Sequence, residues 1–163
     1  MKEKFLEGKG AVITGGASGF GKGTALEFAE KGANLVLVDV NEEQLEQTVG
    51  EIEKKTGQTV VPITCDVSDP SQVKAMGKRA FKELENVYVV FNNAGVGGVY
   101  GKSLLRINEN IWDNVMNINL KGQWLVAKAL WRKMQKQDFQ PLAGKMIHTA
   151  SIAGMDPDPA LPV

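Results

Sequence analysis

An apolar strand that runs directly into a glycine-rich turn, and from there into a helix, limits most strongly how this chain can fold. In the stretch 11–21, AVITGGASGFG, Val12 and Ile13 are typical of a buried strand, and the apolar residues from Ala25 to Ala29 follow a helical spacing. Glycine lets a backbone approach a phosphate closely, and a helix N-terminus offers unpaired N–H donors and a positive dipole end. The stretch therefore predicts a cradle for the pyrophosphate of a dinucleotide.

Two phosphate-binding motifs compete for this turn. From Gly16 the chain fits the P-loop pattern G-x-x-x-x-G-K-[ST] up to its lysine, but Gly23 stands where a Mg²⁺-binding hydroxyl is required. The dinucleotide spacing G-x-G-x-x-G is not met either, since the chain reads T-G-x-x-x-G-x-G from Thr14. Asp39 favours the dinucleotide. It ends the apolar run 35–38, where a carboxylate can accept both ribose hydroxyls of an adenosine and repel a 2′-phosphate.

Length and composition indicate one soluble domain over residues 1–163, long enough to bury a core. The 19 acidic and 19 basic residues balance, which argues against a nucleic acid or a membrane surface as partner. The sequence has no apolar run long enough to cross a bilayer, and its start lacks the apolar core of a signal peptide. The single cysteine, Cys65, suits a reducing compartment, so we expect a cytoplasmic protein.

Strand and helix patterns alternate along the whole chain without a repeat or a linker. Asn41, with Gln44 three residues later, predicts the start of the second helix, and Asp69-Pro70 predicts the start of the third. Such alternation requires a parallel sheet covered by helices on both faces. We therefore expect a doubly wound, Rossmann-like α/β fold. The further predicted elements are strands at 34–38, 59–65, 87–91 and 145–150 and a long helix from about 109 to 136.

Polar or glycine residues follow the ends of five predicted strands. Ligands of an open parallel sheet bind beyond the carboxyl ends of its strands, so we expect these residues to share one rim. They are residues 15–21, Asp39, Asp66, residues 92–95 and Ser151. Taken alone, Asp66 can equally mark a helix entry, and Asn93 can equally brace a turn through side-chain-to-backbone hydrogen bonds.

Six motifs resemble, in order and in spacing, those of the short-chain dehydrogenase/reductase family over nearly the whole chain. The motifs are Thr14-Gly15-x-x-x-Gly19-x-Gly21, Asp39, Asp66-Val67, Asn92-Asn93-Ala94-Gly95, Asn119 within N-L-K-G, and Ser151 within A-S-I-A-G. The resemblance implies an oxidoreductase that uses NAD to interconvert a secondary alcohol and a ketone by hydride transfer. Its partner would be a small-molecule alcohol or ketone.

The resemblance also implies a role for each motif. The residues expected around the pyrophosphate are Gly15, Ser18, Gly19, Phe20 and Gly21. Asp39 is expected at the adenosine ribose, as the mark of NAD over NADP, and Asp66 and Val67 at the adenine. The residues expected along the path to the nicotinamide are Asn93, Ala94 and Gly95. Ser151 would orient the substrate oxygen and polarise a carbonyl, and Asn119 would belong to the proton-relay framework.

Ser151 does not predict a hydrolase. The sequence has no G-x-S-x-G elbow, and His148 lies three positions earlier on a predicted strand, where alternation places it on the opposite face. We expect His148 to pack or hydrogen-bond structurally.

One part of the family's pattern is missing. Family members give or take the hydroxyl proton with a tyrosine that has a lysine four residues later, but Tyr88 and Tyr100 are followed at that distance by Asn92 and Leu104. In relatives this tyrosine lies beyond the serine, at a distance that here falls just after Val163. Further strands and a helix then complete the family's sheet, so the resemblance implies a Rossmann-like fold that lacks its C-terminal strands. We therefore expect the chain to be the N-terminal portion of a dehydrogenase, and to be inactive or nearly so by itself.

Two other functions stay open at this stage: a non-catalytic NAD-binding or dimerising module, and a P-loop-type phosphotransferase. The tryptophans of the long helix, Trp112, Trp124 and Trp131, are assigned to core and subunit packing. In members of the resembled family this helix pairs with its counterpart in another subunit, so the resemblance implies a homo-oligomer formed through the 109–136 helix. No His/Cys/Asp cluster has metal-ligand spacing, so no metal is expected. Cys65, inside an apolar strand, is expected to be buried and inert.

Overall fold

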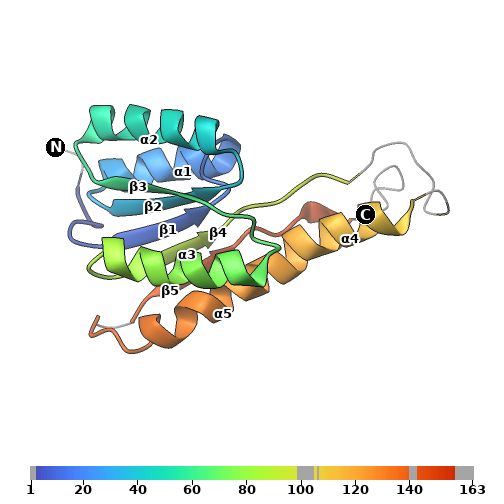
Figure 1. The fold of residues 1–163 in the computed structure, drawn as a ribbon. Helices are drawn as coiled ribbons and strands as arrows, with labels where there is room; N and C mark the ends of the chain where they lie inside the picture. The colour runs from blue at the N-terminus through green and yellow to red at the C-terminus, as the bar shows by residue number, and fades with distance from the viewer. Residues whose placement is uncertain (1–2, 99–104, 106, 140–142, 157–163) are drawn as a thin grey trace.

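The fold is a parallel five-stranded sheet in the strand order β3-β2-β1-β4-β5 (Figure 1). The computed structural model describes residues 3–98, 105, 107–139 and 143–156. The strands are β1 (Gly10–Thr14), β2 (Asn34–Asp39), β3 (Val60–Thr64), β4 (Val89–Asn92) and β5 (Lys145–His148). The doubly wound α/β fold expected from the sequence is confirmed.

Helices cover both faces of the sheet (Figure 1). On one face lie α1 (Gly19–Glu30) and α2 (Glu42–Thr56). On the other lie α3 (Pro70–Glu83) and α5 (Gln123–Met134). α5 is preceded by the π-helical segment η2 (Asn117–Gly122) and by α4 (Glu109–Met116), which extends past the ends of the strands (Figure 1). Successive residues of β1 serve the two faces in turn: Val12 packs with the α3 and α5 side, and Ile13 with the α1 and α2 side. This two-sided burial explains why the central strands read as continuous apolar runs.

The predicted helix starts are confirmed by their capping bonds. The Asn41 side chain accepts from the Gln44 backbone N–H at 3.1 Å and begins α2. Asp69 begins α3, with Pro70 in the first turn, and accepts from the Ser71 and Gln72 backbones at 2.7 and 3.2 Å. The hydroxyl of Ser71 and these N–H groups hold the pKa of the Asp69 carboxyl down to about 2.

The long helix differs from the prediction in two ways. It is interrupted by η2, where the turns widen, so it does not run as one α-helix over 109–136. Its three tryptophans, Trp112, Trp124 and Trp131, are 46%, 55% and 56% exposed, so their assignment to the core is wrong. The core positions of this segment are held instead by Val115, Leu125, Val126 and Leu130.

The strand order places the ends of β1 and β4 at the centre of one sheet edge. β1 pairs with β2 on one side and with β4 on the other. The strands before β4 are therefore added on one side of β1, and those from β4 onward on the other side. Such a switch point leaves a crevice outside the carboxyl ends of the strands. Among the described residues, no helix has the length and apolar character needed to cross a membrane.

Candidate functional site

The turn after β1 is packed so tightly that two of its positions accept only glycine. Gly15 has φ +67°, in the left-handed region, and a Cβ there would lie 2.9 Å from the Asn93 side chain. A Cβ on Gly21 would overlap the carbonyl oxygen of Gly15. The first turn of α1 therefore lies directly against the end of β1. The predicted strand–glycine turn–helix unit is present in the structure, with Gly15 and Gly21 in mutual contact.

The N-terminus of α1 is free to bind an anion. Ser18 is the N-cap, and its side chain makes no capping hydrogen bond to this helix. The first helical bond runs from Lys22 N–H to Ser18 O at 3.0 Å, so the N–H groups of residues 18–21 have no acceptor within the helix. A Cβ on Gly19 would meet no heavy atom within 4 Å, so the space above the turn is open. The donors and the open space fit a phosphate group.

Asp39, at the end of β2, reaches the glycine turn. Its Oδ2 accepts from the Ala17 backbone N–H at 3.1 Å, and its Oδ1 accepts from the Asn41 backbone N–H at 3.1 Å. Each carboxylate oxygen is held by one backbone donor and keeps a lone pair for another. The carboxylate is thus oriented by the protein and can still accept from a pair of hydroxyl groups.

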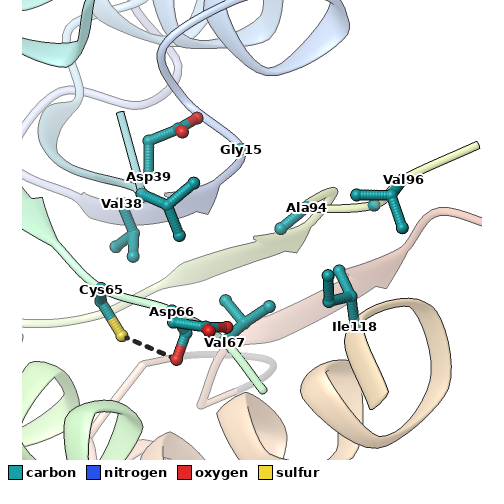
Figure 2. A pocket seen from close by; sticks show the side chains of 11 residues that line it. Gly15, Val38, Asp39, Cys65, Asp66, Val67, Ala94, Val96 and Ile118 are labelled. Atoms are coloured by element: carbon teal, nitrogen blue, oxygen red, sulfur yellow. Dashed lines mark hydrogen bonds between the residues drawn. The ribbon is translucent and has the colours of Figure 1, made fainter. Parts of the chain in front are cut away.

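A pocket of about 120 Å³ opens between the ends of β1, β2, β3 and β4 (Figure 2). Six of its wall residues were predicted from the sequence: Gly15, Asp39, Asp66, Val67, Ala94 and Gly95. The other five were not predicted: Val38, Val40, Cys65, Val96 and Ile118. The walls thus combine two carboxylates with apolar surface, and the described lining contains no Lys, Arg or His. Such a wall suits a flat apolar ring with a polar edge more than an anion.

Asp66 takes part in the turn into α3 and also lines the pocket. Its Oδ1 accepts from the Ser68 backbone N–H at 2.8 Å and from the Ser68 hydroxyl at 2.7 Å, which shapes the turn into α3. It also lines the pocket, where Figure 2 places it across from Asp39. Its neighbour Cys65 is buried, and burial, followed by the charges of Asp66 and Asp69, raises the pKa of the thiol to about 11.

Asn93 links β4 to the glycine turn. Its backbone N–H donates to the Thr14 hydroxyl at 3.0 Å, and its Nδ2 donates to the Thr14 carbonyl at 3.3 Å. The turn-bracing interpretation of Asn93 is therefore present in the structure. Ala94 and Gly95 follow it into the pocket wall.

Asn119 lies in η2 and clamps the segment after β4. Its Oδ1 accepts from Val96 N–H at 2.9 Å, and its Nδ2 donates to Val96 O at 2.9 Å, so the side-chain amide pairs with this backbone as a neighbouring strand would. η2 also supplies Ile118 to the pocket wall. A Cβ on Gly122 would lie 2.9 Å from the Val67 side chain, so η2 approaches the pocket closely.

His148 and Ser151 do not form a pair among the described residues. Gln123 Nε2 donates to Thr149 O at 3.0 Å, which turns Gln123 Oε1 toward His148 Nδ1, also at 3.0 Å. Asn92 Nδ2 lies 3.4 Å from the same ring nitrogen, so Gln123 and Asn92 both contact the imidazole. Ser151 is exposed, and its Oγ accepts from the Ala153 backbone N–H at 3.2 Å. The expected structural role of His148 agrees with this network.

The structure thus gathers the predicted residues into two groups. The turn at residues 15–21, Asp39 and Asn93 are joined by direct hydrogen bonds or contacts, and Asp39 and Asp66 share a pocket. Asn119 contacts the pocket wall through Val96, whereas Ser151 is not part of the lining. In the described part of the chain, no group of three His, Cys, Asp or Glu side chains is arranged to hold a metal ion.

Comparison with known proteins identifies similar chains. The family model of short chain dehydrogenases matches residues 9–163. A 3-oxoacyl-[acyl-carrier-protein] reductase of Thermotoga maritima is 36% identical over 154 residues, which is 94% of this chain and 60% of that protein. The crystal structure of an NAD+-bound xylitol dehydrogenase superposes with a TM-score of 0.89 at 29% identity, over 96% of this chain and 58% of that one.

A short chain dehydrogenase/reductase of Burkholderia phymatum in complex with NAD is also similar. Its TM-score is 0.88 at 35% identity, over 96% of this chain and 54% of that one. The chain therefore spans 54% to 60% of the length of these three proteins.

The environment of Cys65 predicts a thiol that reacts only when the chain unfolds. It is 2% exposed and its pKa is about 11, so at mildly alkaline pH the nucleophilic thiolate is scarce and covered. We expect a disulfide reagent such as DTNB to label the native chain at least about tenfold more slowly than the chain in concentrated urea. Cys65→Ser supplies the background rate, and equal rates in the two conditions would contradict the buried placement.

Proposed function

The chain belongs to the short chain dehydrogenase family. From this premise we propose that it binds NAD(H) and is part of an oxidoreductase that interconverts a secondary alcohol and a ketone. Family membership sets the phosphotransferase alternative aside. The observation that carries the proposal is the contact between the glycine turn and Asp39, because it combines a phosphate cradle with a ribose acceptor in one rigid unit.

For the cofactor, we propose a division of labour among the described residues. The N–H groups of residues 18–21 would hold the pyrophosphate, Asp39 would accept from the two adenosine ribose hydroxyls, and the pocket beside Asp66 and Val67 would take the adenine. Asn93, Ala94 and Gly95 would lead toward the nicotinamide. Two carboxylates and the lack of a basic side chain in the described pocket lining support NAD over NADP, whose 2′-phosphate they would repel.

For the reaction, the bound nicotinamide would accept or supply the hydride. The hydroxyl of Ser151 would donate to the substrate oxygen and stabilise the charge that develops there. Asn119 would belong to the framework that relays the proton. The acid/base is a group that the 163 residues do not supply as a Tyr-x-x-x-Lys motif. We propose that this motif lies in coding sequence beyond Val163, and that the substrate is a small alcohol or ketone.

The exposed tryptophans support a second copy of the chain as a partner. Trp124 and Trp131 lie seven residues apart on α5 and so share one helix face, with the exposed Leu120 one turn before. Exposed apolar surface of this kind marks an interaction site more often than a solvated face. We propose a homo-oligomer formed through this helix, in a cytoplasmic enzyme organised as one domain over 1–163.

Replacing Asp39 by Asn tests the cofactor assignment. The amide keeps the size of the side chain but loses the charged acceptor, so we expect NADH to bind roughly 10- to 100-fold more weakly while NADPH loses less. Fluorescence titration of both dinucleotides measures the two affinities. Glu42→Gln is the control, because it removes an exposed charge three residues away that does not line the pocket. An unchanged ratio of NADH to NADPH affinity would show that another residue selects the cofactor.

Turnover tests the reaction. We expect little activity from the 163-residue chain, and NADH-linked conversion of ketones by a chain extended with the coding sequence that follows Val163. In that extended chain, Ser151→Ala removes a donor to the reacting oxygen and is expected to lower kcat by about 10²- to 10³-fold without weakening NADH binding. Ser71→Ala, in the cap of α3, is the matched control. If the extended chain bound NADH but converted no secondary alcohol or ketone, the non-catalytic alternative would be favoured.

Introducing charges on the face of α5 that carries Trp124 and Trp131 tests the proposed oligomer. The double variant Trp124→Lys/Trp131→Lys places like charges on the proposed contact, and we expect it to sediment as a smaller species than the wild type. Phe5→Lys is the control, because Phe5 is 57% exposed but lies outside this helix. A wild-type chain that stays monomeric at all accessible concentrations would rule out this interface for the 163 residues.

A further inference from the structure

Thr48 is a buried polar residue that none of the motifs contains. It lies in α2 on the face that packs on the sheet, beside Leu45, Val49 and Ile52, and is 1% exposed. Its hydroxyl donates to the carbonyl oxygen of Ala17, in the glycine turn, at 2.8 Å. The bond spans 31 positions of sequence and is buried, so it is made without competition from water.

The direction of this bond is unusual for a threonine inside a helix. Such a hydroxyl often bonds to the carbonyl one turn earlier in its own helix, and Thr56 of α2 does so, to Ile52 O at 2.8 Å. The Thr48 hydroxyl instead donates to the glycine turn, outside its own helix. α2 also lies beside α1 (Figure 1), and the ion pair of Lys22 with Glu51, at 2.7 Å, joins the two helices.

With Thr48 included, three successive peptide units of the turn are each held by at least one hydrogen bond. Gly16 N–H donates to Val38 O at 3.1 Å, and Ala17 N–H donates to Asp39 Oδ2 at 3.1 Å. Ala17 O then accepts from Thr48. The carbonyl of Ala17 and the N–H of Ser18 belong to the same peptide plane, so Thr48 fixes the direction of the first N–H group of the anion cradle. A hydrogen bond to the carbonyl also polarises that amide and strengthens its N–H as a donor.

We propose that Thr48 is a positioning residue for dinucleotide binding, which orients the Ser18 N–H toward the pyrophosphate through the Ala17 carbonyl. This inference rests on the proposed function, because it assigns the bound group to the cradle of α1. Thr48 does not touch the ligand. Its effect is therefore confined to the phosphate portion, whereas the adenosine portion depends on Asp39 and the pocket.

The test compares two threonines of the same helix. Thr48→Val removes the hydroxyl at nearly constant shape. Thr56→Val removes a hydroxyl whose bonds, to Ile52 O at 2.8 Å and from Gln58 N–H at 3.2 Å, lie at the C-terminal end of α2 and do not reach the glycine turn. We expect Thr48→Val to bind NADH and ADP about tenfold more weakly than the wild type, with adenosine binding unchanged. Thr56→Val should bind all three like the wild type. Thr48→Ser keeps the donor and should restore most of the affinity for NADH and ADP.

Each outcome bears on one proposal or the other. If the wild-type chain binds neither NADH nor ADP, the proposed cofactor site is wrong and the role of Thr48 falls with it. If the wild type binds both and Thr48→Val behaves like Thr56→Val, the role of Thr48 alone is overturned. An equal loss for adenosine, NADH and ADP would show general loosening of the fold and would also overturn it. Thr48→Ala is the second variant. If neither Thr48→Ala nor Thr48→Val folds, Thr48 is required for folding, and its proposed role in positioning the Ser18 N–H is overturned.

Discussion

The hydrogen bond from the Ala17 backbone N–H to the Asp39 carboxylate is the interaction on which the site depends. It joins two segments that lie 22 positions apart in sequence and that the sheet brings together, because Thr14 and Val38 are partners in the β1–β2 ladder. The bond orients the carboxylate and fixes part of the glycine turn at the same time. The proposed phosphate cradle and the proposed hydroxyl acceptor are thereby joined in one unit before any ligand binds.

Close backbone approach is the second constraint. α1 can begin directly above β1 because no side chain separates Gly15 from Gly21, and η2 can approach the pocket because Gly122 leaves room for Val67. In both places a single methyl group would have to displace backbone or a buried side chain. The glycines therefore bring the open N–H groups of α1 and the pocket wall to the same edge of the sheet.

The features predicted correctly from the sequence are those encoded locally. Alternating apolar patterns located the strands to within about two residues, and the caps at Asn41 and Asp69 began helices where predicted. Polar and glycine residues after β1, β2, β3 and β4 were predicted to meet because parallel strands all end at one edge, and they do, whereas Ser151 after β5 does not line the pocket. The interruption of the long helix at η2 was not predicted, since its apolar spacing continues through the wider turns.

Of the two roles expected for the tryptophans, core and subunit packing, the core role is wrong, because residue type indicates hydrophobicity but not which way a helix faces. The apolar half of the pocket was also missed. Val38, Cys65 and Ile118 come from three separate elements, and nothing in their own neighbourhoods distinguishes them from core residues. Thr48 lies on the buried stripe of α2, and only that polar exception in an apolar pattern could have drawn attention to it.

By itself the sequence determined the alternation of strand and helix, the glycine turn, and the identity of the polar groups at the strand ends. These follow from local propensities and from the period of the apolar pattern. Only the tertiary structure decided that Thr48 reaches Ala17, that Asn119 pairs with Val96, and that five apolar side chains complete the pocket. The reason is physical: hydrogen bonds and walls between distant segments depend on how the helices lie on the sheet, which no local pattern records.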